Sequence, residues 1–502
     1  MREKLVALAL ALLSGVLYAR ALAPEAPPAL AWIALVPLFA ACARAGPRLG
    51  AACGAVFAGV ASALLTLWFP GMLERYFGLA PAQAWLGWLG LAVCIDAPPY
   101  ALLGAWLGWQ ARRAPVPPLL VGAGWLLAEL LRSYGPVPAP FALLATSQLD
   151  TPWVQSADAI GAFGVGALVA TGNAALASLG APVLRGRHPR RDLAFAAAIL
   201  LAAILYGSDR LAREFADGPP LRVVVVQPDP GPGSIPGEAS QRFEQLLALT
   251  SEVAERAPDL VFWPESAVGF YPREPGAARA RLLALTRSLR ADLLLGAPHY
   301  RNGEPSPDYY SSVFALHEGH VTGRYDKIQL VPFADYAPGD RSPTNEPVRY
   351  RPGSDPRPLA MAGVSVGAFL CGEVLFPEVA RALAQRGAGI LANPSNDEWF
   401  GAPAPANHQL RAAALRAIEN RRPLVRPTTG GYSAVIDAHG RILARSGFAT
   451  PVVLEASVRP SNATTLHQRA GSAVALGAAG ALAVASFPRR RRALATQEES
   501  SP

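Results

Sequence analysis

Charged residues are scarce in this chain of 502 residues. Asp, Glu, Lys and Arg make up 16% of it and hydrophobic residues 51%, whereas a soluble protein of this size carries about 25% charged residues. The sequence therefore predicts that part of the chain lies in lipid. The net charge of +8 does not indicate a nucleic-acid partner, because the arginines form short clusters beside apolar segments and do not line one amphipathic face.

Cysteine is also scarce, and its spacing excludes two common uses. The chain has no CxxC pair and no Cys/His cluster, so we expect neither a zinc site nor a disulfide framework. It also lacks a P-loop and a GxGxxG motif after a strand, which leaves nucleotide binding without support. No cofactor or metal is therefore expected. The four cysteines are Cys42, Cys53 and Cys94, which lie in or beside the long apolar stretches of the first half, and Cys371, the only cysteine after residue 94.

Long apolar stretches fill the first 208 residues. Because a helix needs roughly 20 residues to cross the hydrocarbon core, we predict about eight transmembrane helices, seven within 1–208 and the last at 470–487. The first stretch also fits a signal peptide, but the apolar stretches that follow it favour a retained helix. The seven stretches lie near 5–22, 29–43, 50–69, 84–110, 116–132, 158–181 and 192–208.

Basic clusters mark one side of this predicted bundle. They fall before the first stretch and after the second, fourth, sixth and eighth, so all lie on one side when eight helices are counted. The positive-inside rule makes that side the cytoplasm. Residues 209–469 would then form a non-cytoplasmic domain, and 488–502 a cytoplasmic tail. The clusters are Arg2 and Lys4, Arg44 and Arg48, Arg112 and Arg113, Arg185 to Arg191, and Arg489 to Arg492.

Residues 209–469 have the pattern of an α/β domain. Apolar strands alternate with helices at about 238–256, 278–290, 377–387 and 409–421, and two hairpins interrupt the alternation, the first with a turn at Glu318 and Gly319. This order predicts a sheet covered by helices. The predicted strands include LRVVVVQP (221–228), DLVFWPES (259–266), ADLLLGAPHY (291–300), VSVGAFLCGEV (364–374) and GILANPSN (389–396).

Three reactive side chains follow apolar strands of this domain: Glu265, Lys327 and Cys371. Ligands of open α/β sheets bind beyond the carboxyl ends of the strands, so these side chains could converge. A carboxylate can take the proton of a thiol, and an ammonium can stabilise the oxyanion that forms when the thiolate attacks a carbonyl. Together they suffice for acyl transfer through a thioester. Singly, each has an ordinary explanation: a buried small hydrophobe for Cys371, a helix cap or surface carboxylate for Glu265, and a solvated lysine for Lys327.

The order of several longer stretches is more specific. WPES, GRYDKIQLVPFADYAPGD, FLCGEVLFPE, NPSNDEWFG and NHQLRAAALRAIENRRPLVR resemble, in that order, the nitrilase superfamily with its Glu-Lys-Cys triad. With seven apolar stretches before them and one after, the chain resembles the apolipoprotein N-acyltransferases, integral membrane enzymes that complete bacterial lipoprotein maturation. APPALAWIALVPLF and WLLAELLRS extend the resemblance into the apolar half.

The resemblance implies a fold, a location and a site. It implies an αββα sandwich on a membrane helical bundle, in the bacterial inner membrane with the sandwich on the periplasmic side. Glu265 would be the general base, Lys327 the stabiliser of the oxyanion and Cys371 the nucleophile, with Glu373 and Asp335 as supporting carboxylates. The substrates would be a phospholipid acyl donor and the diacylglyceryl-cysteine amine of an apolipoprotein.

The sequence departs from the family pattern around this implied site. Asp335 stands where a glutamate is usual, Gly372 replaces a tyrosine, and the loop PDPGPGSIPGEAS lacks an expected tryptophan. PAPFALLATSQ and PTTGG also differ from the usual residues. Loops near 229–237 and 400–406 are rich in Gly and Pro and are expected to act as lids. Two alternatives stay open: a membrane-anchored nitrilase-like amidase that uses water as acceptor, and a membrane transporter or scaffold that has lost catalysis.

Overall fold

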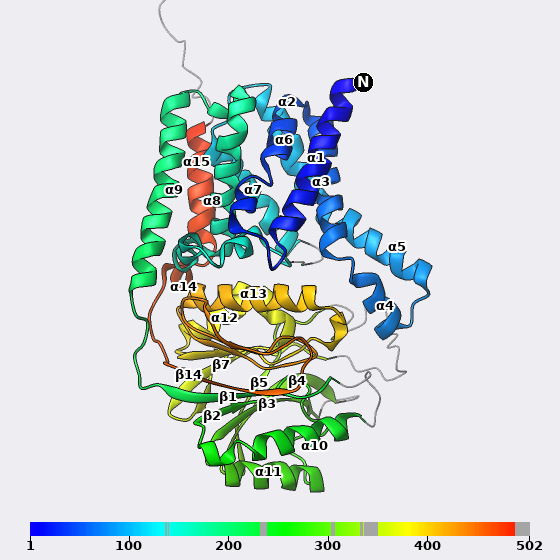
Figure 1. Ribbon diagram of the computed structural model, residues 1–502, viewed down its shortest axis with the longest axis vertical. Coiled ribbons are helices and arrows are strands. Elements are labelled where there is room, and N and C mark those ends of the chain that lie inside the picture. The colour runs from blue at the N-terminus through cyan, green and yellow to red at the C-terminus, as the bar shows by residue number, and fades with distance from the viewer. Residues whose placement is uncertain are drawn as a thin grey trace, which may run out of the picture.

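The protein has a helical part and an α/β part, which lie end to end in Figure 1. The computed structural model describes residues 1–135, 138, 140–230, 238–302, 307–331, 335 and 350–486. Most of the predicted lid at 229–237 and the whole predicted tail at 488–502 lie outside the described residues. The N-terminal helices and the last described helix form one bundle, and the chain between them forms the α/β part.

The bundle contains helices that are long and apolar enough to cross a membrane. Within the described residues there are five of them, together with a shorter apolar segment at Pro28–Arg44. The helical N-terminal region is therefore confirmed, but the predicted count of eight spans is not. The bundle elements are α1 (Arg2–Ala21), α2 (Val36–Arg44), α3 (Pro47–Leu65), α6 (Ala97–Ala111), α7 (Pro118–Tyr134), α8 (Ala157–Gly180), α9 (Pro189–Ala212) and α15 (Ala473–Ser486).

Two of the predicted apolar helices have the wrong extent. The stretch at 29–43 is broken into a 3₁₀ turn at Pro28–Trp32 and α2, because Pro37 lacks the N–H of a helix interior and sits in the first turn of α2. The stretch at 50–69 ends at Leu65, and α4 (Phe69–Phe77) and α5 (Pro81–Leu91) then leave the bundle as a lateral arm (Figure 1). A π-helical turn at Ala92–Asp96 joins that arm to α6.

Glycines allow α3 and α6 to pack closely. A Cβ atom at Gly54 would lie 1.9 Å from the carbonyl oxygen of Tyr100, and one at Gly50 would lie 2.2 Å from that of Gly104. Helices in a lipid environment gain little from burying apolar side chains against each other, so close backbone contact becomes a main source of their association. The Gly and Ala content of this stretch therefore reflects packing within the bundle.

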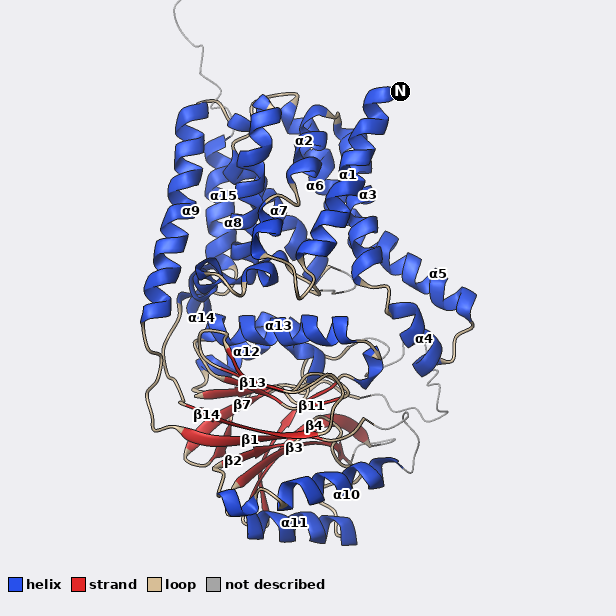
Figure 2. Cartoon of the chain, viewed as in Figure 1, coloured by secondary structure: helices blue, strands red, loops and turns tan. Residues whose placement is uncertain are grey.

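The α/β part is built from two six-stranded sheets (Figure 2). The first has the strand order β14-β1-β2-β3-β4-β5 and the second β13-β12-β10-β8-β7-β6. Helices α10 and α11 cover the first sheet, and α12 and α13 cover the second (Figure 2). The elements of the first half are β1 (Leu221–Gln227), α10 (Glu238–Ser251), β2 (Leu260–Phe262), α11 (Ala277–Leu289), β3 (Asp292–Arg301), β4 (Asp308–His317) and β5 (His320–Asp326).

The second half of the α/β part supplies most of the second sheet and its helices. A separate two-stranded sheet pairs β11 with β9. The elements are β6 (Leu359–Met361), β7 (Val364–Ala368), α12 (Pro377–Gln385), β8 (Ile390–Ala392), β9 (Ser395–Asn396), α13 (Pro403–Asn420), β10 (Leu424–Arg426), β11 (Thr428–Thr429), β12 (Ala434–Ile436), β13 (Ile442–Arg445), β14 (Val452–Val458) and α14 (Leu466–Ala470).

The run of valines in β1 is explained by burial on both faces. Val223 and Val225 pack between the two sheets, whereas Val224 and Val226 pack beneath α10 and α11. Successive side chains of a strand point to opposite faces, so a strand covered on both sides has no polar alternation. The arrangement of helices, sheet, sheet and helices confirms the predicted α/β class.

Several predicted strand boundaries are wrong, and the errors fall near the predicted site. Strand β2 ends at Phe262, before Pro264, which has no N–H for a sheet ladder. Strand β7 ends at Ala368, and Cys371–Leu375 is a 3₁₀ turn. The predicted lid at 400–406 is helical from Pro403, where α13 begins. Strand β14, which the sequence reading missed, pairs with the whole length of β1.

Helix α13 connects the α/β part to the bundle (Figure 1). Arg421, just beyond its end, is fully buried and lies 2.9 Å from the carboxylate of Asp158 at the start of α8. Glu419 accepts a 2.8 Å hydrogen bond from the backbone N–H of Ala162 in α8. Buried charged contacts thus hold the two parts together.

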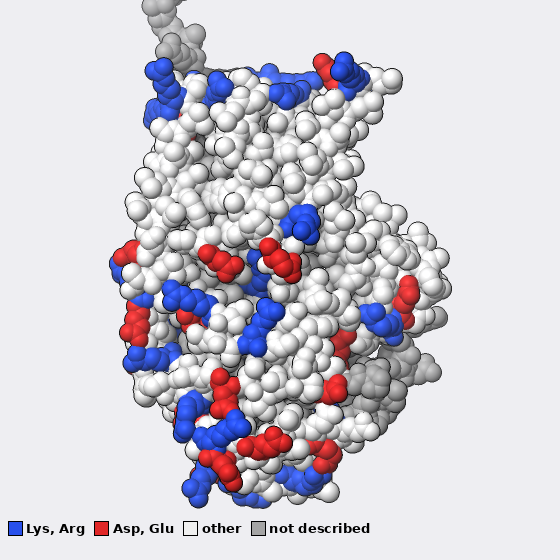
Figure 3. Space-filling model, viewed as in Figure 1, with Lys and Arg blue, Asp and Glu red and all other residues white. Residues whose placement is uncertain are grey.

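Charge is distributed unevenly over the bundle. On the face shown in Figure 3 the bundle is almost uncharged, with Lys and Arg gathered at the end remote from the α/β part. Charged side chains of both signs reappear where the bundle meets that part and cover much of the α/β surface.

Candidate active site

Cys371 lies in a tight turn directly after β7. Its φ of +44° is in the left-handed region, which non-glycine residues seldom adopt. The turn is held by two contacts from the segment after β8: the N–H of Cys371 donates to Pro394 O at 2.8 Å, and Asn393 Nδ2 donates to Cys371 O at 3.3 Å. Backbone strain of this kind persists where the surroundings enforce it, and it clusters at functional sites.

Lys327, directly after β5, lies between two carboxylates. Its Nζ is 3.4 Å from Glu265 Oε1 and 2.9 Å from Asp335 Oδ2. All three side chains are buried. Asp335 also accepts a 2.7 Å hydrogen bond from the N–H of Val331, which fixes its orientation. The shorter side chain of aspartate at this position therefore still reaches the lysine.

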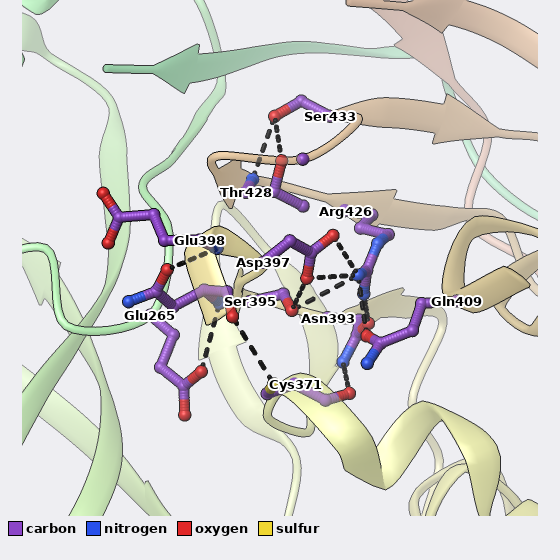
Figure 4. Close-up of polar contacts among 12 residues, drawn as sticks. Glu265, Cys371, Asn393, Ser395, Asp397, Glu398, Gln409, Arg426, Thr428 and Ser433 are labelled. Atoms are coloured by element: carbon purple, nitrogen blue, oxygen red, sulfur yellow. Dashed lines mark hydrogen bonds and ion pairs between the residues drawn. The ribbon is translucent and has the colours of Figure 1, made fainter. Parts of the chain in front are cut away.

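Asn396 links the carboxylate of Glu265 to the thiol. Its N–H donates to Glu265 Oε2 at 3.1 Å, and its carbonyl oxygen lies 3.9 Å from Cys371 Sγ. Figure 4 shows Glu265 and Cys371 converging on this segment. The structure thus brings together Glu265, Lys327, Cys371 and Asp335.

Burial sets the protonation of these groups. Burial, followed by the negative charge of Glu265, raises the pKa of Cys371 to about 12. The positive charge of Lys327 opposes this rise. Burial also raises the pKa of Glu265, against the opposing charge of Lys327. Burial alone would lower the pKa of Lys327, but the carboxylates of Glu265 and Asp335 outweigh it and hold that pKa well above the usual value. At neutral pH the site therefore holds a thiol beside a charged ammonium.

Glu373 is close to Cys371 in sequence but serves the backbone. Its carboxylate accepts hydrogen bonds from the N–H groups of Ile328 at 2.8 Å and Leu370 at 2.6 Å, and from the hydroxyl of Tyr325 at 2.8 Å. It therefore ties the chain after β5, which carries Lys327, to the turn that carries Cys371. The predicted strand at 364–374, which includes both residues, is wrong from Cys371 onward, because Cys371–Leu375 is a 3₁₀ turn.

Arg426 organises the segment beside the nucleophile, and the sequence reading missed it. It is fully buried, with its Nη2 2.9 Å from Asp397 Oδ2 and 2.9 Å from Gln409 Oε1 (Figure 4). It also contacts Asn393, whose amide donates to Cys371 O. A charged residue that ends the apolar strand Leu424–Arg426 was the available signal, since a buried arginine needs partners.

Comparison with known proteins agrees with this geometry. Residues 222–468 match the carbon-nitrogen hydrolase family, and residues 14–175 match the apolipoprotein N-acyltransferase N-terminal domain. The chain is 30% identical to an apolipoprotein N-acyltransferase of Geobacter metallireducens, over 97% of this chain and 96% of that protein. The chain belongs to the apolipoprotein N-acyltransferase family. Its α/β part is accordingly a nitrilase-like carbon-nitrogen hydrolase domain.

Further relatives of this acyltransferase family cover less of the chain. An apolipoprotein N-acyltransferase of Brucella melitensis is 30% identical over 78% of this chain and 80% of that protein. Among solved structures, an amidase from a Nesterenkonia species is 23% identical, covering 50% of this chain and 95% of its own, with a TM-score of 0.38.

Gly372 is an unusual residue for apolipoprotein N-acyltransferases, and the structure gives it a local reason. A Cβ atom at this position would lie 2.8 Å from Val331 Cγ2. Because valine is stiff about χ1, this close neighbour leaves little space for a side chain. The glycine after the nucleophile is therefore matched to the packing of Val331.

Proposed function

We propose that this protein transfers a fatty acyl chain from a membrane phospholipid, through a thioester on Cys371, to the N-terminal amine of the diacylglyceryl-cysteine of an apolipoprotein. One observation carries the proposal: Cys371 lies beside Glu265, which is paired with Lys327 at 3.4 Å, in a chain whose described residues include five helices long and apolar enough to cross a membrane. The names of its relatives specify the acceptor.

The first half-reaction forms the thioester. Glu265 takes the proton of the Cys371 thiol while the sulfur attacks the ester carbonyl carbon of the phospholipid. The ammonium of Lys327 stabilises the oxyanion of the tetrahedral intermediate. The carbon–oxygen bond then breaks, Glu265 returns its proton to the leaving oxygen, and a lysophospholipid departs.

The second half-reaction consumes the thioester. The acceptor amine attacks the thioester carbonyl, and Lys327 again stabilises the oxyanion. Glu265 takes a proton from the attacking nitrogen as the carbon–sulfur bond breaks, and it passes that proton to the sulfur. The products are an N-acylated lipoprotein and the free Cys371 thiol, so the two half-reactions form a ping-pong cycle.

The proposed placement follows from the substrates. Residues 1–208 and 470–487 would span the bacterial inner membrane, residues 209–469 would form the periplasmic catalytic domain, and residues 488–502 the cytoplasmic tail. The Lys and Arg side chains at the remote end of the bundle (Figure 3) support this orientation. Moving an acyl chain into water costs about 0.8 kcal/mol per CH₂, so a site at the membrane surface lets the chains stay in hydrocarbon.

Intact mass spectrometry of the full-length protein tests the proposal. Incubation with phospholipid is expected to add one acyl mass, which disappears in Cys371→Ala and persists in Cys94→Ala, a control because Cys94 is an exposed free cysteine. Adding a diacylated lipopeptide should then yield a triacylated product. Release of free fatty acid alone would instead identify a hydrolase, and an acyl mass that survives in Cys371→Ala would reject the nucleophile.

A further inference from the structure

A cavity of about 500 Å³ lies between the bundle and the carbon-nitrogen hydrolase domain. Its bundle side is formed by the chain after α1 and before α8 and by the end of α9, including Pro24, Asp150 and Leu211. Its domain side is formed by α13 and the hairpin of β12 and β13. None of the residues that line it is Glu265, Lys327, Cys371, Asp335 or Glu373. The cavity is thus separate from the site described above.

The charged side chains that line the cavity are mostly basic. Arg411 of α13 and Arg441 and Arg445 of the hairpin face one carboxylate, that of Asp150. Among the described residues, no ion pair joins any of these arginines to an acidic side chain; the pairs that are formed lie elsewhere. The cavity therefore has an excess of positive charge that an anion would neutralise.

Arg411 keeps donors for a ligand. It is half-buried, and three of its contacts go to carbonyl oxygens of the bundle: Leu22 at 3.2 Å, Ala23 at 3.2 Å and Thr146 at 2.7 Å. A guanidinium has five N–H donors, and no described residue accepts the other two. Because its position is fixed by the bundle, Arg411 can bind an anion with little further loss of conformational freedom.

The cavity lies at the level where a lipid headgroup would be. Its lining includes Pro24, which follows α1, and Leu211, at the end of α9. On the face shown in Figure 3, the uncharged band gives way to charged side chains where the bundle meets the α/β part. Only 11% of the apolar stretch of helix α9 above it is buried, and Leu201 and Leu205 are exposed. Ile442 and Leu443 of the hairpin are exposed beside the arginines. Apolar surface for acyl chains thus adjoins basic side chains for a phosphate.

We propose that this cavity binds the phosphodiester headgroup of an intact phospholipid that is not the acyl donor. Arg411, Arg441 and Arg445 would hold the phosphate, and the acyl chains would lie along α9. Such a lipid would connect α1, α9, α13 and the hairpin of β12 and β13. The inference rests on the proposed placement in the membrane but not on the chemistry at Cys371.

Native mass spectrometry of the full-length protein, in a Cys371→Ala background that prevents acylation, tests this site. The protein is purified in mild detergent and titrated with phospholipid in mixed micelles. Because the proposed acyl-donor site is present in both proteins, the parent is expected to retain one phospholipid more than Arg441→Glu/Arg445→Glu, in which binding at the cavity should weaken at least tenfold. Arg287→Glu, on α11 at the far side of the hydrolase domain, is the matched control and should bind as the parent does.

Each outcome decides the inference. Equal retention in the parent and in the double variant would overturn it, as would a parent that retains none. Competition by millimolar inorganic phosphate, together with binding that does not require acyl chains, would overturn the assignment to a lipid. Circular dichroism of the double variant separates lost binding from lost folding, and Arg441→Lys/Arg445→Lys should restore most binding. Failure of acyl transfer in the protein with Cys371 intact would leave this result unaffected.

Discussion

The sulfur of Cys371 lies next to Glu265 because the backbone of Cys371 adopts a strained left-handed conformation. The length of the side chain is not what brings it there. The φ of +44° is enforced by two hydrogen bonds: the N–H of Cys371 donates to Pro394 O, and Asn393 Nδ2 donates to Cys371 O. The thiol is also kept protonated by burial, because its pKa is about 12. In the proposed mechanism, nucleophile and base are thus positioned before substrate arrives, and the proton would move only during attack.

This protonation predicts an unusual pH dependence. In a Cys94→Ala background, alkylation of Cys371 by iodoacetamide should be slow at neutral pH and rise about tenfold per pH unit toward a pKa near 12. Acylation by phospholipid should instead fall as the pH is lowered through the raised pKa of Glu265, since protonated Glu265 cannot accept the thiol proton. Rapid-quench mass spectrometry measures both rates. An alkylation rate that levels off near pH 7 would contradict the raised thiol pKa.

Gly372 provides a second test at the residue scale. Gly372→Ala places a Cβ atom 2.8 Å from Val331 Cγ2, and overpacking of this kind costs about 1–3 kcal/mol. We expect a lower denaturation midpoint and slower acylation. Val331→Ala should relieve the contact, so the double variant should recover most of both losses. Two effects that simply add would show that the residues are not coupled.

At the residue scale, the sequence predicted which side chains lie together but not the direction in which each side chain points. Glu265, Lys327 and Cys371 were predicted to converge because each follows a strand, and the structure places them together. The orientation of Glu373 could not be predicted, because it depends on a 3₁₀ turn where the apolar pattern indicated a strand. Arg426 was missed because its partners Asp397 and Gln409 come from segments that only the fold brings beside it.

At the scale of elements, the segment from β8 to β9 contacts both Cys371 and Glu265. Asn393 and Pro394 hold the Cys371 turn, and Asn396 donates to Glu265. Arg426 contacts the residue that follows this segment, Asp397, through a buried ion pair. The buried ion pair of Arg426 and Asp397 thus helps to hold the segment that contacts both Cys371 and Glu265.

Asp397→Asn tests this dependence. Removing one partner of a buried ion pair leaves an uncompensated charge, which costs about 3–5 kcal/mol. We expect a large fall in the free energy of unfolding and slower acylation of Cys371. Asp355→Asn is the control, because Asp355 pairs with Arg386 at the surface, with both side chains about half exposed, and exposed pairs contribute about 0–1 kcal/mol. Equal destabilisation in denaturant titrations would contradict the assigned importance of Arg426.

At the scale of the whole molecule, the two parts are joined by charges buried at their contact. Asp158 of α8 lies 2.9 Å from Arg421 Nη2, 3.2 Å from Arg210 Nε, and 2.8 Å from the hydroxyl of Tyr206. The bundle and the hydrolase domain should therefore unfold together. The alternation of strands and helices predicted the domain class. Nothing in the sequence indicated that Asp158, at the start of an apolar stretch, pairs with the distant Arg421.

Asp158→Asn should uncouple the two parts. Because Arg421 is fully buried, losing its carboxylate is expected to cost about 3–5 kcal/mol and to split one thermal transition of the detergent-solubilised protein into two. Asp209→Asn, which removes an exposed pair with Arg213, should leave a single transition. Differential scanning calorimetry distinguishes these outcomes, and one unchanged transition in Asp158→Asn would contradict the coupling.

The pairing of β1 with β14 constrains the order in which the protein can fold. Leu221 lies opposite Val458 and Gln227 opposite Val452, so the first and last strands of the domain are neighbours, and α15 follows the last one into the bundle against α7 and α8. During translation, β1 leaves the ribosome well before β14 and α15 do. With the placement proposed above, α15 can pack against α7 and α8 only after the intervening polypeptide has crossed the membrane, so the bundle is completed last.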